Sequence, residues 1–175
     1  MKGKTEAFTL IEVLITIGLI SAVACAVMMF FLVNINSFAI LKNDTELQFQ
    51  SQYIMNFISK KVMESRCVED IRIGTLSAIN STREYSISRI SLRYGDTNHD
   101  CYIFEIRNNN EIFYGNGNYN SSAEAELGVY VKELKVAPYP SGKRFAQADA
   151  LRITLCLYNK GQEYEAEQII YLRNS

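Results

Sequence analysis

Apolar residues are concentrated at the N-terminal end of the chain. The segment 8–33 reads FTLIEVLITIGLISAVACAVMMFFLV, with one charged residue, Glu12, and no proline. An α-helix of this length is roughly 39 Å long. Because the hydrocarbon core of a bilayer is about 30 Å thick, the pattern predicts a transmembrane helix over 8–33.

The residues ahead of this segment indicate its orientation. They read MKGKTEA and include Lys2 and Lys4. Positive residues stay on the cytoplasmic side, so the remainder of the chain is expected to cross the membrane. A secretory signal peptide has a shorter apolar core and a small-residue cleavage site, and this layout lacks both. The sequence therefore predicts a single-pass protein of the cytoplasmic (inner) membrane, N-terminus in and C-terminus out.

The helical pattern continues beyond the apolar segment. Residues 34–66 contain no glycine or proline, and Gly74 is the natural outer limit, so we assign 34–73 to an amphipathic half of the helix. One face is apolar: Leu47, Ile54, Phe57, Ile58 and Val62. The opposite face is predicted to meet water: Gln48, Gln52, Asn56, Ser59 and Lys60. Polar residues predict a bend or fraying at three places: Asn34, Asn36 and Asn43-Asp44.

Beyond Gly74 the apolar period changes from the helical value to two, which is typical of strands. Six strands are predicted: 85–94 with a bulge near Arg89, 101–107, 111–114, 129–136, 151–158 and 163–172. Residues 115–126 are rich in Gly, Asn and Ser and are expected to form a loop. Most turns are too short for helical crossovers, so the strands should be antiparallel. The fold class is therefore α+β, a long N-terminal helix followed by a β-rich head over 74–175.

Composition adds two limits. A chain of 175 residues has room for one domain and one additional segment. The net charge of −1 does not indicate the basic face that nucleic-acid binding needs, so direct contact with nucleic acid is not expected.

Candidate chemistry in the head is sparse. His99 is the single histidine, without a second imidazole or a paired nucleophile, and we expect neither an enzyme nor a cofactor. Asp96, Asn98 and Asp100 match the first half of a calcium loop, although Cys101 stands where such a loop needs glycine. The same residue types also form ordinary turns.

Cysteines and tyrosines each leave two interpretations open. Cys25 lies in the apolar segment, whereas Cys67, Cys101 and Cys156 lie beyond it. These three allow one disulfide or remain thiols. The 11 tyrosines serve packing or form a sugar-binding platform.

The carboxylate of Glu12 is the feature that an ordinary membrane anchor does not explain, since an ionisable group in lipid is costly. The residues around it are Ala7-Phe8-Thr9-Leu10-Ile11-Glu12-Val13-Leu14-Ile15. This string closely resembles the class III signal of type IV prepilins. The resemblance implies cleavage between Ala7 and Phe8, loss of the leader 1–7 and N-methylation of Phe8. The family usually has Gly before the cut, where this chain has Ala7.

The resemblance also implies a pilin fold and a role in assembly. Glu12 takes the position of the family's fifth-residue glutamate and would pair with the α-amino group of Phe8 on a neighbouring subunit. The helix 8–33 would form the filament core. The expected partners are the prepilin peptidase/methylase, other pilin or pseudopilin subunits and the membrane platform of the assembly machine. After assembly the subunit would lie in an extracytoplasmic pilus or pseudopilus.

A long helix followed only by strands is similar to the PilW-type minor pilins and J-type pseudopilins. This similarity implies a minor subunit that initiates or caps assembly, and such subunits serve adhesion or motility pili, type II secretion and DNA uptake. The alternative is a single-pass, membrane-anchored binding or adhesion protein that does not polymerise.

Overall fold

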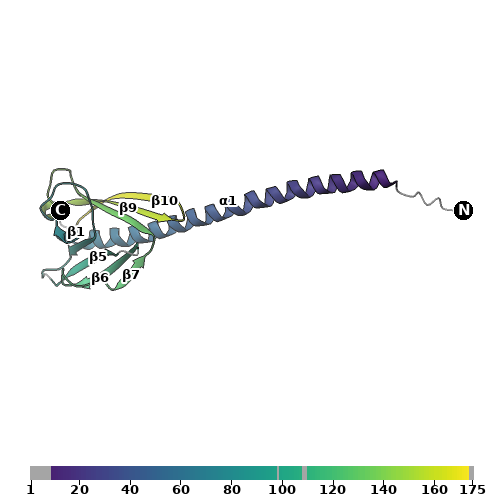
Figure 1. Ribbon diagram of the computed structural model, residues 1–175. Coiled ribbons are helices and arrows are strands. Elements are labelled where there is room, and N and C mark those ends of the chain that lie inside the picture. The colour runs from purple at the N-terminus through teal and green to yellow at the C-terminus, as the bar shows by residue number, and fades with distance from the viewer. Residues whose placement is uncertain (1–8, 98, 108–109, 174–175) are drawn as a thin grey trace. The chain divides into compact units, whose positions relative to one another are not determined.

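The computed structural model describes residues 9–97, 99–107 and 110–173 and comprises two compact units, 1–42 and 43–175. One long helix, α1 (Leu10–Glu64), contributes to both (Figure 1). Antiparallel strands follow it, which confirms the α+β class with a long N-terminal helix. The helix is continuous through Asn34, Asn36 and Asn43, so the fraying expected there is not observed.

The end of α1 lies earlier in the chain than predicted. Ser65 Oγ donates to the main-chain oxygen of Lys61 at 2.6 Å. The next amide, Arg66 N, donates to Arg93 O at 2.7 Å and leads the chain into a sheet. The residues from Cys67 to Ile73, which we assigned to the helical half, therefore form strand β1.

The strands of the second unit form two sheets, and every pair is antiparallel. The first sheet has the order β2 (Leu76–Ser77), β1 (Cys67–Ile73), β4 (Arg89–Arg93), β5 (Cys101–Arg107), β6 (Glu111–Gly117), β7 (Ala125–Gly128). The second has the order β10 (Gln162–Tyr171), β9 (Ala150–Asn159), β8 (Val131–Tyr139), β3 (Tyr85–Ser86). A short 3-10 helix, η1 (Phe145–Gln147), connects β8 to β9.

The irregularity expected near Arg89 is a change of sheet rather than a bulge. Ile87 N donates to Leu134 O in the four-stranded sheet at 2.9 Å. The next residue, Ser88, donates from its amide to Arg72 O in the six-stranded sheet at 2.8 Å. The phase slip in the sequence therefore marks the point where the chain passes from β3 to β4.

The second unit has its core between the helix and the two sheets. The predicted stripe is buried at Leu47, Ile54, Ile58 and Val62, whereas Phe57 is half-buried. Full burial of each such side chain contributes about 1.5–3 kcal/mol. Figure 1 shows the sheets on both sides of this part of α1, with β9 and β10 on one side and β5, β6 and β7 on the other.

One prediction for the polar face of the helix is wrong. Gln48, Gln52, Asn56 and Lys60 are exposed, but Ser59 is buried. Its Oγ donates to Oε1 of Gln168 on β10 at 2.7 Å, because the second sheet reaches further around the helix than the apolar stripe indicates.

The predicted loop folds back over the outer face of the six-stranded sheet. The main-chain oxygens of Tyr119 and Ser121 each accept a hydrogen bond from Arg89 Nη2 at 2.6 Å. Arg107 Nη2 donates in the same way to Ala123 O. Part of the expected loop also pairs with β6 as strand β7, at the edge of the six-stranded sheet.

Candidate functional site at the start of the helix

Thr9 and Glu12 form a capping box at the start of α1. The amide and the hydroxyl of Thr9 each donate to Oε2 of Glu12 at 2.9 Å. In return, Glu12 N lies 3.4 Å from Thr9 Oγ1 and 3.1 Å from Thr9 O. This reciprocal pattern satisfies amides that a helix start otherwise leaves without partners. The carboxylate of Glu12 is therefore held beside the N-terminus of the helix.

Thr9 is the site residue that the sequence reasoning missed. The signal was present, because Thr followed three residues later by Glu ahead of an apolar run is the capping-box pattern. The predicted cleavage site at Ala7 and Phe8 lies outside the described residues.

Further polar side chains of this part of the helix form hydrogen bonds within it. Thr16, Ser21, Asn34 and Ser37 each donate to the main-chain oxygen four residues earlier, at 2.6–2.9 Å. Such bonds let polar residues sit in an apolar environment without leaving a donor unsatisfied. The helix is long and apolar enough to cross a membrane.

The described residues from 9 to 42 include no buried side chain. Exposure of large apolar side chains also extends past the predicted span of 8–33. Four of them are more than half exposed: Ile35 (61%), Phe38 (72%), Ile40 (54%) and Leu41 (61%). The apolar surface of the first unit therefore requires lipid or other protein to cover it over its whole length.

The calcium candidates in the head are engaged with the protein itself. Asp96 forms an ion pair with Arg66. Oδ2 of Asp100 accepts hydrogen bonds from Thr97 Oγ1 at 2.7 Å and from Thr97 N at 3.3 Å, an arrangement typical of a turn. Asn98 lies outside the described residues. Among the residues that the structure does describe, no group of three or more His, Cys, Asp or Glu side chains is arranged to hold a metal ion.

The structure holds Cys67, Cys101 and Cys156 as thiols. Cys67 and Cys101 both pair with Arg93, one from each neighbouring strand, so two strand spacings of roughly 5 Å each separate them. A disulfide needs Cα atoms within about 7 Å. Cys156 belongs to the other sheet. This arrangement favours the thiol interpretation.

Several tyrosines gather beside the helix rather than on a free platform. Tyr94 stacks on Tyr102 with ring centroids 4.3 Å apart, and Lys61 Nζ lies 4.3 Å from the centroid of Tyr102. Tyr102 also donates from its hydroxyl to Glu64 Oε2 at 2.9 Å. Tyr114 packs edge-on against Phe57 at 4.9 Å. These contacts favour packing over sugar binding for this group of tyrosines.

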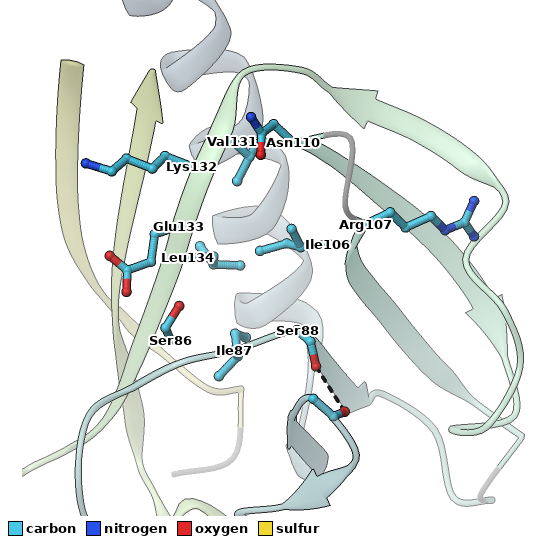
Figure 2. A pocket seen from close by; sticks show the side chains of 11 residues that line it. Ser86, Ile87, Ser88, Ile106, Arg107, Asn110, Val131, Lys132, Glu133 and Leu134 are labelled. Atoms are coloured by element: carbon cyan, nitrogen blue, oxygen red, sulfur yellow. Dashed lines mark hydrogen bonds between the residues drawn. The ribbon is translucent and has the colours of Figure 1, made fainter. Parts of the chain in front are cut away.

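A cleft of about 550 Å³ lies between the two sheets, next to the segment where the chain changes sheet (Figure 2). Ile87, Ile106 and Leu134 lie in its middle. The charged side chains of Lys132 and Arg107 extend away from it, to Glu163 at 2.9 Å and to Ala123 O respectively. The hydroxyl of Ser88 lies 3.1 Å from Arg72 O and 3.3 Å from Gly74 O. The polar groups of the cleft thus hold neighbouring segments in place.

His99, the remaining candidate, is exposed in the turn after β4. Its Nδ1 lies 3.4 Å from Nδ2 of Asn118. The site that combines unusual chemistry with an unusual surface is therefore the start of α1. Comparison with protein-family models, with curated proteins and with solved structures gave no match.

Proposed function

We propose that this chain is a minor type IV pilin or pseudopilin, incorporated into a pilus or pseudopilus through its N-terminal helix. The observation that carries the proposal is the carboxylate of Glu12 at the head of an apolar helix whose described residues up to 42 include no buried side chain, in the sequence F-T-L-I-E behind a short basic leader. As a minor subunit it would initiate or cap assembly, a role supported by the resemblance to PilW-type and J-type subunits.

The length of the exposed apolar surface favours assembly over simple anchoring. From Leu10 to Leu41 the helix is about 48 Å long, whereas a hydrocarbon core is about 30 Å thick. To bury all of this helix in lipid, it would have to tilt by roughly 50°, beyond the 0–40° range of transmembrane helices. Helices of neighbouring subunits would cover the excess.

In this proposal Glu12 sets the register of each incoming subunit. Its carboxylate would meet the positive α-amino group of Phe8 on a subunit already in the filament. Removing one partner of a buried ion pair costs about 3–5 kcal/mol, so such a pair would strongly favour one register over its neighbours. The capping box with Thr9 holds the carboxylate at the N-terminal end of the helix.

Processing and location follow from the same proposal. The prepilin peptidase would remove residues 1–7 and methylate Phe8 on the cytoplasmic side, while the head lies outside. The membrane platform of the assembly machine would then transfer the subunit into the filament. The β-rich head would contact other subunits at the surface or the tip.

Two substitutions at Glu12 test the mechanism. Glu12→Ala removes both the charge and the capping acceptor, whereas Glu12→Gln removes only the charge, since Gln also completes a capping box. Both variants are expected in the membrane fraction and missing from sheared filaments. If Glu12→Gln enters filaments as the wild type does, the charge pair does not set the register of the incoming subunit. If the wild type never leaves the membrane fraction, the chain is the membrane-anchored binding protein instead.

A further inference from the structure

The first turn of α1 in the second unit is fastened to the head by polar side chains. Asn43 Nδ2 donates to the main-chain oxygen of Asn159 at 2.9 Å, and Asn159 Nδ2 donates to Asn43 Oδ1 at 2.8 Å. Asn43 also donates to Oε1 of Gln162. Asn159 and Gln162 bound the turn between β9 and β10, so this turn is tied to the helix.

The loop between β7 and β8 is also joined to the helix, about one helical turn after Asn43. Tyr130, between β7 and β8, donates from its hydroxyl to Glu46 Oε1 at 3.1 Å. We call the five side chains Asn43, Glu46, Tyr130, Asn159 and Gln162 the clasp, because together they join both sheets to one turn of the helix.

The backbone of the clasp is strained at Tyr130. Its φ of +66° lies in the left-handed region, which is a genuine outlier for a bulky residue and costs conformational energy. Two main-chain hydrogen bonds hold it there. Tyr158 N donates to Tyr130 O at 2.8 Å, and the next amide, Val131 N, donates to Asn110 O at 2.7 Å.

Apolar burial is unevenly distributed along this part of the helix. Between 43 and 53 the buried apolar side chain is Leu47, whereas the stretch from 54 to 62 buries Ile54, Met55, Ile58 and Val62. Segments with few buried apolar contacts open locally at lower free energy than the core does. The stretch 43–53 is therefore held to the head by Leu47 and by the polar contacts of the clasp, whereas 54–62 is held by four buried apolar side chains.

We infer that the clasp is a releasable fastening, at which the helix turn 43–47 parts from the head while 54–62 stays packed. The hydrogen bonds of Asn43 and the bond from Tyr130 to Glu46 hold the closed state. Opening leaves about one more turn of the helix, or roughly 5 Å, without contacts to the head. A helical turn without such contacts opens its own main-chain hydrogen bonds more readily, so its amides exchange faster. The inference concerns the head alone and holds whether or not the chain enters filaments.

Hydrogen exchange on the full-length protein in detergent micelles tests this directly. In the wild type, amides of 43–50 and of the turn 159–162 are expected to exchange at least tenfold faster than those of 54–62. Asn43→Ala should raise exchange at 43–50 and 159–162 a further tenfold and leave 54–62 unchanged. The matched control, Gln52→Ala, alters an exposed residue of the same helix and should change neither region.

Equal protection of 43–50 and 54–62 in the wild type would mean that the helix opens as one unit, and it would overturn the inference. The same conclusion follows if Asn43→Ala raises exchange equally across the whole head. No change at 43–50 in that variant would show that Asn43 does not hold the clasp closed. Each of these outcomes is independent of filament incorporation.

Discussion

Asn43 and Asn159 join the helix to the sheet across 116 residues of sequence, each donating a side-chain hydrogen bond to the other residue. Asn43 is only 7% exposed, so its amide has exchanged water for these partners. A polar residue in an otherwise apolar face would ordinarily weaken a helix. Here it fixes the position at which the head begins.

The first prediction concerns the energy of this pair. Asn43→Ala removes the oxygen to which Asn159 Nδ2 donates and should lower the free energy of unfolding by about 1–3 kcal/mol. Asn159→Ala should also destabilise the head. The double variant should lose less than the two losses added together, because both single changes remove the same bond. Chemical denaturation of the wild type, the two single variants and the double variant measures these free energies. If the losses of unfolding free energy add, the two residues do not interact.

The second prediction tests the loop over the six-stranded sheet. A Cβ at Gly115 would lie 2.9 Å from Ala123 Cα and 3.0 Å from Ser122 O, which are backbone atoms that cannot turn aside. Gly115→Ala should therefore displace the loop and destabilise the head by about 1–3 kcal/mol. Cleavage within 118–124 by a protease should accelerate. Ser122→Ala, at an exposed position of the same loop, is the control and should cleave at the wild-type rate.

The third prediction ranks the thiols of the head by their rate of modification with iodoacetamide. Burial raises the pKa of the Cys101 thiol to about 11, and burial also raises the pKa of Cys156. Only thiolates react readily, and both side chains are inaccessible. Cys67 is half-buried, so iodoacetamide should modify it first in the native protein, as peptide mass spectrometry would show. Modification of Cys101 before Cys67 would contradict the fold around β5.

In the Gly115→Ala variant the relative modification rates of Cys101 and Cys156 should change. Ile103 and Cys101 lie on the sheet face that the loop covers, since Tyr102 between them faces the helix. Displacing the loop should therefore raise the modification rate of Cys101 while that of Cys156, in the other sheet, stays the same.

The fourth prediction concerns pH. The hydrogen bond from Lys61, followed by that from Tyr102, lowers the pKa of Glu64. Glu64 therefore stabilises the fold above its pKa in the unfolded chain, about 4.3. This stabilisation is lost as pH falls through its pKa in the folded protein. Burial, followed by the bond to Glu64, raises the pKa of Tyr102. Tyr102 therefore stabilises the fold below its pKa in the unfolded chain, about 10. This stabilisation is lost as pH rises through its pKa in the folded protein.

The midpoint of thermal unfolding should therefore be highest between about pH 5 and pH 9. Glu64→Gln should remove the acid-side contribution of this carboxylate and reduce the alkaline decline only in part, since burial is the larger cause of the raised pKa of Tyr102. A variant with the same acid and alkaline limbs as the wild type would show that the Lys61–Glu64–Tyr102 group does not determine them.

Local patterns predicted a large part of the fold. The apolar spacing of Leu47, Ile54, Ile58 and Val62 reports directly which helix face is buried, and alternation identifies the longer strands. Strand β1 was missed because no glycine or proline separates it from the helix. Strand β7 was missed because it lies where Gly, Asn and Ser are frequent. Both depend on pairing with a neighbouring strand rather than on their own sequence.

The candidate site could be predicted only where its partners are close in sequence. Glu12 was found from its charge in an apolar run, and its partner Thr9 is only three residues away. Asn43 could not be identified in this way, because its partners follow more than a hundred residues later. The same limit applies to the hydrogen bonds of Arg89 to the loop, because they are accepted by main-chain oxygens, which carry no side-chain signature.

The mass of the N-terminal peptide tests the central proposal most directly. The protein would be purified from membranes of cells that contain the assembly machine, and its N-terminal peptide analysed by mass spectrometry. The proposal predicts loss of residues 1–7 and an N-methylated Phe8 as the first residue. A peptide that still begins at Met1, or an unmethylated start elsewhere, would contradict it.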